Sequence, residues 1–172
     1  IYDYLRLLYA KVGHPHCHKC GKVISKQSPS QIVDIIAAMP EGKRVMILAP
    51  MVRDRKGGHE KVFEKIKKEG FVRIRVDGES HNINEAMTLD PNKKHTIDVV
   101  VDRLVAHDLK KKAVTLKSGQ TIEEKNEDRS RMADSVETAL KFGGGTIKIL
   151  DADTNHEEVF SENFACDHCG NS

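Results

Sequence analysis

The chain has no tryptophan, only three tyrosines and five phenylalanines, and no apolar run approaching the roughly 20 residues that a membrane-spanning helix needs. Its apolar residues, 38% of 172, are therefore mostly aliphatic and predict a modest core. That length suits one ordinary domain, or a compact domain with a small appendage. No charged-then-apolar leader stands at the start. We expect a cytoplasmic protein without membrane spans.

An excess of one charge is also missing. Charged residues make up 31% of the chain, yet the formal net charge is only +2. Dedicated nucleic-acid-binding domains usually carry a strongly basic stripe, so this balance counts against that class. It favours a surface that pairs its charges with those of another protein.

Cysteine is scarce, and its spacing is the strongest signal in the sequence. All four cysteines fall in two Cys-x-x-Cys pairs, Cys17/Cys20 and Cys166/Cys169, each followed by glycine. Two intervening residues let a tight turn present both sulfurs to one ion, and a metal site is favoured over disulfides. We predict one structural Zn²⁺ bound by all four cysteines. Two half-sites completed elsewhere, and reduced cysteines without metal, are the alternatives.

No catalytic pattern accompanies these cysteines. The chain contains neither Gly-x-x-x-x-Gly-Lys-Ser/Thr nor Gly-x-Gly-x-x-Gly. The histidines beside the cysteines are interpreted as neighbours of the metal site, and the scattered remainder as ordinary structural or surface residues. A four-cysteine zinc has no vacant coordination position, which argues against a zinc hydrolase. We expect no enzymatic activity from this chain.

The periodicity predicts helices and strands without a regular β-α-β rhythm. The predicted helices cover 1–12, 30–38, 59–69 and 132–142, and the predicted strands cover 45–49, 71–77, 95–105 and 146–150, with a hairpin within 114–122. At least one side of the main strands is polar. We therefore predict an α+β fold, with a mostly antiparallel sheet, helices packed on it, and a zinc knuckle joining the two ends. The wide separation of the cysteine pairs suits a domain inserted into a host.

Five residues are candidates for binding a partner: Arg73, Arg75, Asp77, Glu79 and Arg103. The first four belong to the alternating strand 71–77 or the turn after it, and the arginines are expected on its exposed face. The last ends the strand 95–105 and would extend the same patch. Arginine presents a planar fork to carboxylates, which suits docking. The pattern alone leaves a docking surface and an ordinary solvated sheet face equally open.

Six stretches, in one order across nearly the whole chain, resemble those of a known family. They are IYDYLRLLYAKVG, EGKRVMILAPMV, RKGGHEKVFEKIKKEGFVRIRVDGE, KKHTIDVVVDRL, DSVETALKFGGG and FSENFACDHCG. The chain thus resembles UvrA, the damage-sensing ATPase subunit of the bacterial UvrABC excision nuclease. The resemblance implies three parts: a host flank with the first knuckle (1–27), an inserted UvrB-binding domain (28–160), and a flank with the second knuckle (161–172).

The resemblance also implies roles for the candidate residues. Arg73 and Arg103 match two arginines through which the family docks UvrB, and Arg75, Asp77 and Glu79 are their neighbours. ATP and Mg²⁺ binding, ATP hydrolysis, DNA contact and homodimerisation are implied for the longer protein. Its phosphate-binding loop is absent from this chain, so the chain itself is expected neither to bind nor to hydrolyse ATP.

The alternative is a nucleic-acid-binding zinc module. In that hypothesis, Lys110, Lys111, Lys112 and the lysines of the helix 59–69 contact phosphates, and binding depends strongly on salt. The acidic content and the lack of aromatic residues on the exposed strands count against it.

Overall fold

The computed structural model describes residues 1–21, 26–85, 88–106, 127–163 and, as backbone only, 112–115 and 121–124. Within this part of the chain there are four helices and eight strands. The helices are α1 (Tyr2–Val12), α2 (Pro29–Ala37), α3 (Glu60–Lys68) and α4 (Glu127–Phe142). The strands are β1 (Arg44–Lys56), β2 (Arg73–Val76), β3 (Glu79–Asn82), β4 (Lys94–Val105), β5 (Lys112–Thr115), β6 (Thr121–Glu124), β7 (Thr146–Asp151) and β8 (His156–Ser161).

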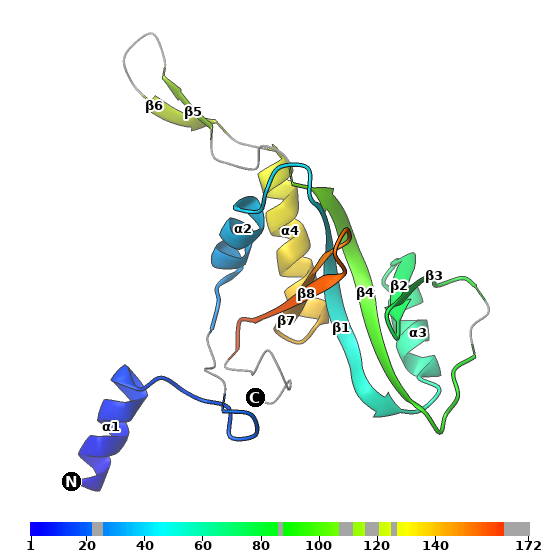
Figure 1. The fold of residues 1–172 in the computed structure, drawn as a ribbon, viewed down its shortest axis with the longest axis horizontal. Helices are drawn as coiled ribbons and strands as arrows, with labels where there is room; N and C mark the ends of the chain where they lie inside the picture. The colour runs from blue at the N-terminus through cyan, green and yellow to red at the C-terminus, as the bar shows by residue number, and fades with distance from the viewer. Residues whose placement is uncertain (22–25, 86–87, 107–111, 116–120, 125–126, 164–172) are drawn as a thin grey trace.

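Six strands form one sheet in the order β3-β2-β4-β1-β7-β8, and every pairing in it is antiparallel. The strands β5 and β6 form a separate hairpin (Figure 1). Buried residues of α2, α3 and α4 join the side chains of one sheet face in the main core. The predicted α+β class, with an antiparallel sheet and helices packed on it, is confirmed.

The core is aliphatic, as the composition indicates. On the helix-covered face, Ile47 of β1, Ile97 of β4 and Ile149 of β7 are each 1% exposed or less. The opposite face carries a smaller apolar cluster in which Leu48 and Val100 are paired across the β1–β4 ladder. Among the described residues, no helix contributes a side chain to this second cluster, and the same face carries Arg75, Asp98 and Lys148.

The start of α2 is stabilised by a capping box between Ser28 and Gln31. The Ser28 side chain accepts a hydrogen bond from the Gln31 backbone N–H, and the Gln31 side chain accepts one from Ser28 N–H. This reciprocal capping box satisfies backbone donors that the first helical turn leaves unpaired. Pro29 occupies the first turn, where its missing N–H costs nothing.

Two elements are longer than predicted, and two were missed. The strand predicted at 45–49 continues to Lys56 as β1, because β4 supplies backbone partners as far as the pair Lys56 and Lys94. The helix predicted at 132–142 begins earlier, at Glu127, as α4. The short polar strands β3 and β8 were not predicted, because their sequences carry little apolar alternation.

The two ends of the sheet domain meet. The backbone N–H of Gln27 donates to the carbonyl of Ser161 at 2.9 Å. Beyond that junction, α1 lies apart from the sheet, and none of its residues is buried (Figure 1). Among the described residues, no helix has the length and apolar character needed to cross a membrane.

Candidate docking site

A hollow of about 390 Å³ opens where β4 runs past the beginning of β2. Its lining comes from the α3–β2 connection, the second half of β4 and the first half of α4. The lining residues are Gly70, Phe71, Val72, Arg73, Val100, Val101, Asp102, Arg103 and Arg131. The structure therefore brings Arg73 and Arg103, thirty residues apart in the sequence, to one site, and both are exposed.

The register of the sheet explains why these arginines converge. The pairing of β2 with β4 ends at Ile74 and Val99, so the following residues of β4 border the hollow. On its other side, β4 has a register shift at Val101, between the pairs Leu48–Val100 and Ile47–Asp102. Such a bulge re-aims the side chains that follow it. Asp102 consequently reaches α4, where its carboxylate meets Ser135 and Arg131.

Arg75 is a buried residue of β2. It was expected on the exposed face of β2, but its side chain is only 5% exposed. The guanidinium pairs with Glu157 of β8, and it donates to Asn155 Oδ1 at 2.8 Å and to the carbonyl of Gly78 at 2.9 Å. The expectation of exposure was wrong because β8, unseen in the sequence, returns over this face of the sheet.

Asp77 and Glu79 also lie outside the hollow lining. Asp77 occupies the β2–β3 turn, where its carboxylate accepts from Thr96 N–H at 2.7 Å and lies 2.6 Å from His95 Nδ1. Glu79 begins the outer strand β3 with its side chain exposed. Of the five candidate residues, only Arg73 and Arg103 line the hollow.

His95 is buried between two acceptors. Its Nδ1 faces the Asp77 carboxylate, and its Nε2 lies 2.9 Å from the carbonyl oxygen of Asp90. Both contacts are hydrogen bonds only when both ring nitrogens carry hydrogen, so this geometry favours the imidazolium cation. The hydrogen bond to Asp77 and that to the Asp90 carbonyl raise the pKa of His95 above its ordinary value. No signal in the sequence distinguished this histidine from the others.

A second charged cluster lies buried on the same face as Arg75. The Lys148 ammonium contacts the Asp98 carboxylate at 2.7 Å and the Glu157 carboxylate at 3.6 Å. Burial raises the pKa of Asp98, although the Lys148 charge works in the opposite direction. Burial also favours the neutral form of Glu157, but Lys148 and Arg75 outweigh it and hold the pKa of that carboxyl below its ordinary range. These charges neutralise one another within the fold.

The first cysteine pair lies in a tight turn. Gly21 N–H donates to the Cys17 carbonyl at 2.8 Å, and Gly21 has a φ of 72°, a conformation that glycine adopts without strain. Cys17 is 3% exposed although the residues beside it are exposed. Cys166 and Cys169 lie outside the described residues. Within the described ranges, no group of three or more His, Cys, Asp or Glu side chains could hold a metal.

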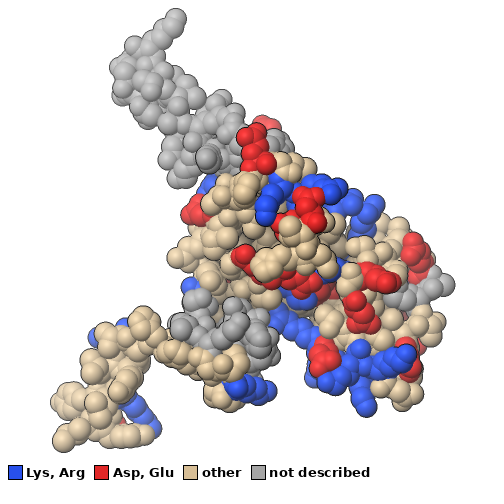
Figure 2. Space-filling model, in the orientation of Figure 1, with Lys and Arg blue, Asp and Glu red and all other residues tan. Residues whose placement is uncertain are grey.

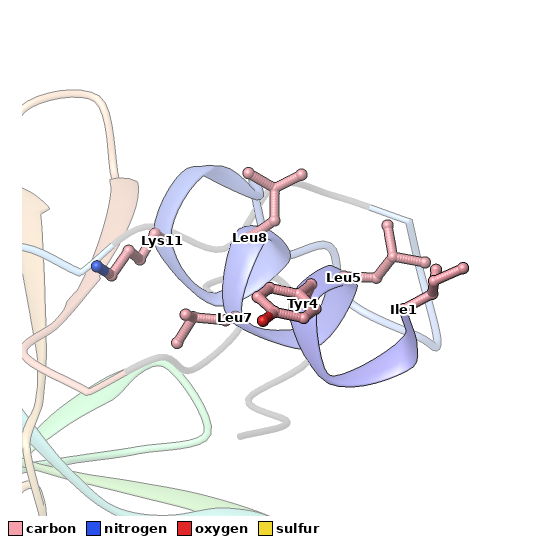
Figure 3. Close-up of a pocket in the computed structure, with 6 residues that line it drawn as sticks. All are labelled: Ile1, Tyr4, Leu5, Leu7, Leu8 and Lys11. Atoms are coloured by element: carbon pink, nitrogen blue, oxygen red, sulfur yellow. The ribbon is translucent and has the colours of Figure 1, made fainter.

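A second hollow has a different character. It measures about 580 Å³ and is lined by α1 together with the preceding residue: Ile1, Tyr4, Leu5, Leu7, Leu8 and Lys11. Figure 3 shows these side chains spreading outward from a single helix. It is therefore the exposed apolar flank of α1, without polar groups converging on it for chemistry.

Comparison with known proteins identifies relatives for nearly the whole chain. Residues 27–153 match the family model described as the UvrA interaction domain. The UvrABC system protein A of Methanothermobacter thermautotrophicus is 51% identical over 167 residues, which are 96% of this chain and 16% of that protein. Its counterparts in Clostridium perfringens and Bacillus subtilis are 48% and 45% identical, over 99% of this chain and 16% of each relative. The chain thus spans about a sixth of the length of these relatives.

The His95 geometry generates the first prediction. His95 should titrate above its ordinary value of 6.5, and replacing Asp77 by Asn should lower that pKa, because a neutral amide stabilises the imidazolium less. Asn suits this position since Asp77 has a φ of 50°, which Asn tolerates. NMR titration of the ring protons of the two proteins measures the difference.

The same interaction fixes the pH dependence of stability. Because the folded-state pKa is raised, the stabilisation is fully present below about pH 6.5 and is lost as the pH rises through the folded-state value. The difference in unfolding free energy between the wild type and Asp77→Asn should therefore shrink as the pH rises. A difference that is constant from pH 5.5 to 9, or identical titration curves, would show that His95 is not held as a cation.

Proposed function

The chain belongs to the UvrA family, whose interaction domain it carries, and from that premise we propose that it docks UvrB through the hollow between β2, β4 and α4. In this proposal UvrB is held for loading onto damaged DNA during nucleotide excision repair. Arg73 and Arg103 are the principal contacts. Arg75 and Asp77 hold the opposite end of β2, the strand that carries Arg73, and Glu79 lies at the outer margin of the surface.

The convergence of Arg73 and Arg103 carries this proposal. Among the described residues, neither guanidinium has an acidic partner in an ion pair, whereas the buried Arg75 is satisfied inside the fold. Unpaired arginine forks in a hollow can bind carboxylates of another protein in two-pronged fashion. The family resemblance selects the same two residues.

We also infer the arrangement of the parts. The contact between Gln27 and Ser161 brings the entry and exit of the sheet domain together, as an insertion into a host requires. This supports residues 28–160 as the inserted domain, with residues 1–27 and 161–172 as flanks. The exposed apolar side of α1 suits packing against the host.

A structural zinc would close this junction. Cys17 and Cys20, with the turn that Gly21 permits, offer two thiolates, and we propose Cys166 and Cys169 as the other two ligands. Four thiolates complete the tetrahedral shell of Zn²⁺, so the ion would contribute folding free energy at the neck and no catalysis.

The remaining activities are assigned to the longer protein. ATP and Mg²⁺ binding, ATP hydrolysis, contact with DNA and homodimer formation require segments beyond this chain, which lacks a phosphate-binding loop. The longer protein would act in the cytoplasm. This chain would act by binding alone.

A second candidate function is nucleic-acid binding by the basic end of the sheet. Figure 2 shows Lys and Arg side chains gathered where β1 ends and β4 begins, with acidic residues among them. The helix α3 adds its exposed lysines: Lys61, Lys65, Lys67 and Lys68. The interspersed acidic groups reduce the attraction for phosphates, so protein docking is the stronger proposal.

Substitutions at the hollow test the docking proposal. Arg73→Ala and Arg103→Ala should each weaken UvrB binding about tenfold or more, because each removes a charge-assisted contact. Arg55→Ala is the matched control, since Arg55 is an exposed arginine of β1 at the other end of the sheet. Calorimetry with purified UvrB at two salt concentrations measures the effect. Binding that survives both substitutions, or that Arg55→Ala alone abolishes, would reject this site.

Zinc content tests the proposed neck. The 172-residue chain should contain one zinc, and Cys17→Ser should lose it with a lower unfolding temperature, because metal affinity is part of the folding free energy. A shortened chain of residues 27–163 lacks all four cysteines but keeps the sheet and the hollow. It should contain no zinc and still bind UvrB. Two zinc ions per chain would favour separate half-sites instead.

A further inference from the structure

Arg131 is a third arginine at the hollow, and no pattern in the sequence singled it out. It precedes the predicted helix 132–142, but α4 begins at Glu127 and places it at the same hollow as Arg73 and Arg103. Its side chain is 60% exposed. The three arginines come from β2, β4 and α4, so they reach the hollow from three independent elements.

Asp102 holds Arg131 in place. Its Oδ1 accepts from Arg131 Nη2 at 2.6 Å and from the Arg103 backbone N–H at 2.7 Å. Its Oδ2 accepts from the Ser135 hydroxyl at 2.9 Å. The Asp102 side chain is only 13% exposed, so groups from β4 and α4 fix this carboxylate within the protein. A guanidinium anchored at one nitrogen keeps its remaining N–H donors for another acceptor.

The balance of charge decides which ligand suits the hollow. Three guanidinium groups line it against a single carboxylate, and that carboxylate is already committed to three donors. The hollow therefore retains positive charge and unused donors. Anchoring Arg131 before docking reduces the side-chain entropy that binding would otherwise cost.

We propose that Arg131 is a third docking arginine, held ready by Asp102, and that the hollow receives an acidic segment of the partner protein whose carboxylates meet all three guanidiniums. This rests on the proposed function, because it assumes that the hollow is the docking site. An acidic peptide is favoured over a nucleic acid because the hollow is small and can receive only a few carboxylates. The basic residues that could follow a phosphate backbone lie elsewhere, at the distant end of β1.

The test compares Arg131→Gln with Lys141→Gln in the full 172-residue chain. Both remove one positive charge from α4, but Lys141 is exposed outside the hollow. With purified UvrB, Arg131→Gln should raise the Kd about tenfold, and Lys141→Gln should leave it within about twofold. Arg131→Lys keeps the charge without the fork and should recover part of the loss.

The salt dependence of UvrB binding distinguishes a partner contact by Arg131 from a purely structural role. If Arg131 contacts the partner, Arg131→Gln should also flatten the rise of Kd with salt concentration, because one intermolecular ion pair is gone. An unchanged salt dependence together with a lower unfolding temperature would assign Arg131 to folding alone and overturn the inference.

The remaining outcomes distinguish the two proposals. If UvrB binds and Arg73→Ala weakens it, but Arg131→Gln does not, the third arginine is rejected and the docking site stands. If the wild-type chain does not bind UvrB, the proposed function itself fails. A single-stranded DNA oligonucleotide that competes with UvrB and loses affinity on Arg131→Gln would replace the acidic peptide by a phosphate ligand.

Discussion

The ion pair between Arg75 and Glu157 connects β2, which carries part of the docking site, with β8 at the far edge of the sheet. Arg75 lies on β2 and Glu157 on β8, which are separated by three other strands in the sheet order. Burying a guanidinium is costly unless its donors are satisfied, and here Glu157, Asn155 and Gly78 satisfy them. The pair therefore specifies how β2 lies against the far end of the sheet. Arg73 lies two residues earlier on the same strand, on the same side as Arg75.

The hollow follows from differences in strand length and register. β2 is four residues long and β4 is twelve, so part of β4 lies beyond the pairing. The bulge at Val101 then separates the two polar side chains that follow. Asp102 engages α4, and Arg103 remains exposed. The fold thus uses the same short segment to attach a helix and to present a charged surface.

The sequence predicted what depends on local pattern. Alternation predicted that Arg73 is exposed, and the structure shows this. Alternation also predicted an exposed Arg75, and this was wrong, because burial by β8 is a tertiary effect that β2 does not encode. The role of His95 and the position of Arg131 likewise depend on partners distant in the chain. Cysteine spacing predicts a zinc site, and this stays a prediction because Cys166 and Cys169 lie outside the described residues.

The central claim is that UvrB docks at the hollow. Hydrogen–deuterium exchange of the 172-residue chain, with and without purified UvrB, tests it without altering any side chain. Exchange should slow in residues 70–73 and 101–103 when UvrB is bound, because docking excludes water from the hollow, and it should be unchanged in α3. Slower exchange confined to α3 and residues 53–56, with the hollow unaffected, would contradict the account and move the docking surface to the basic end of the sheet.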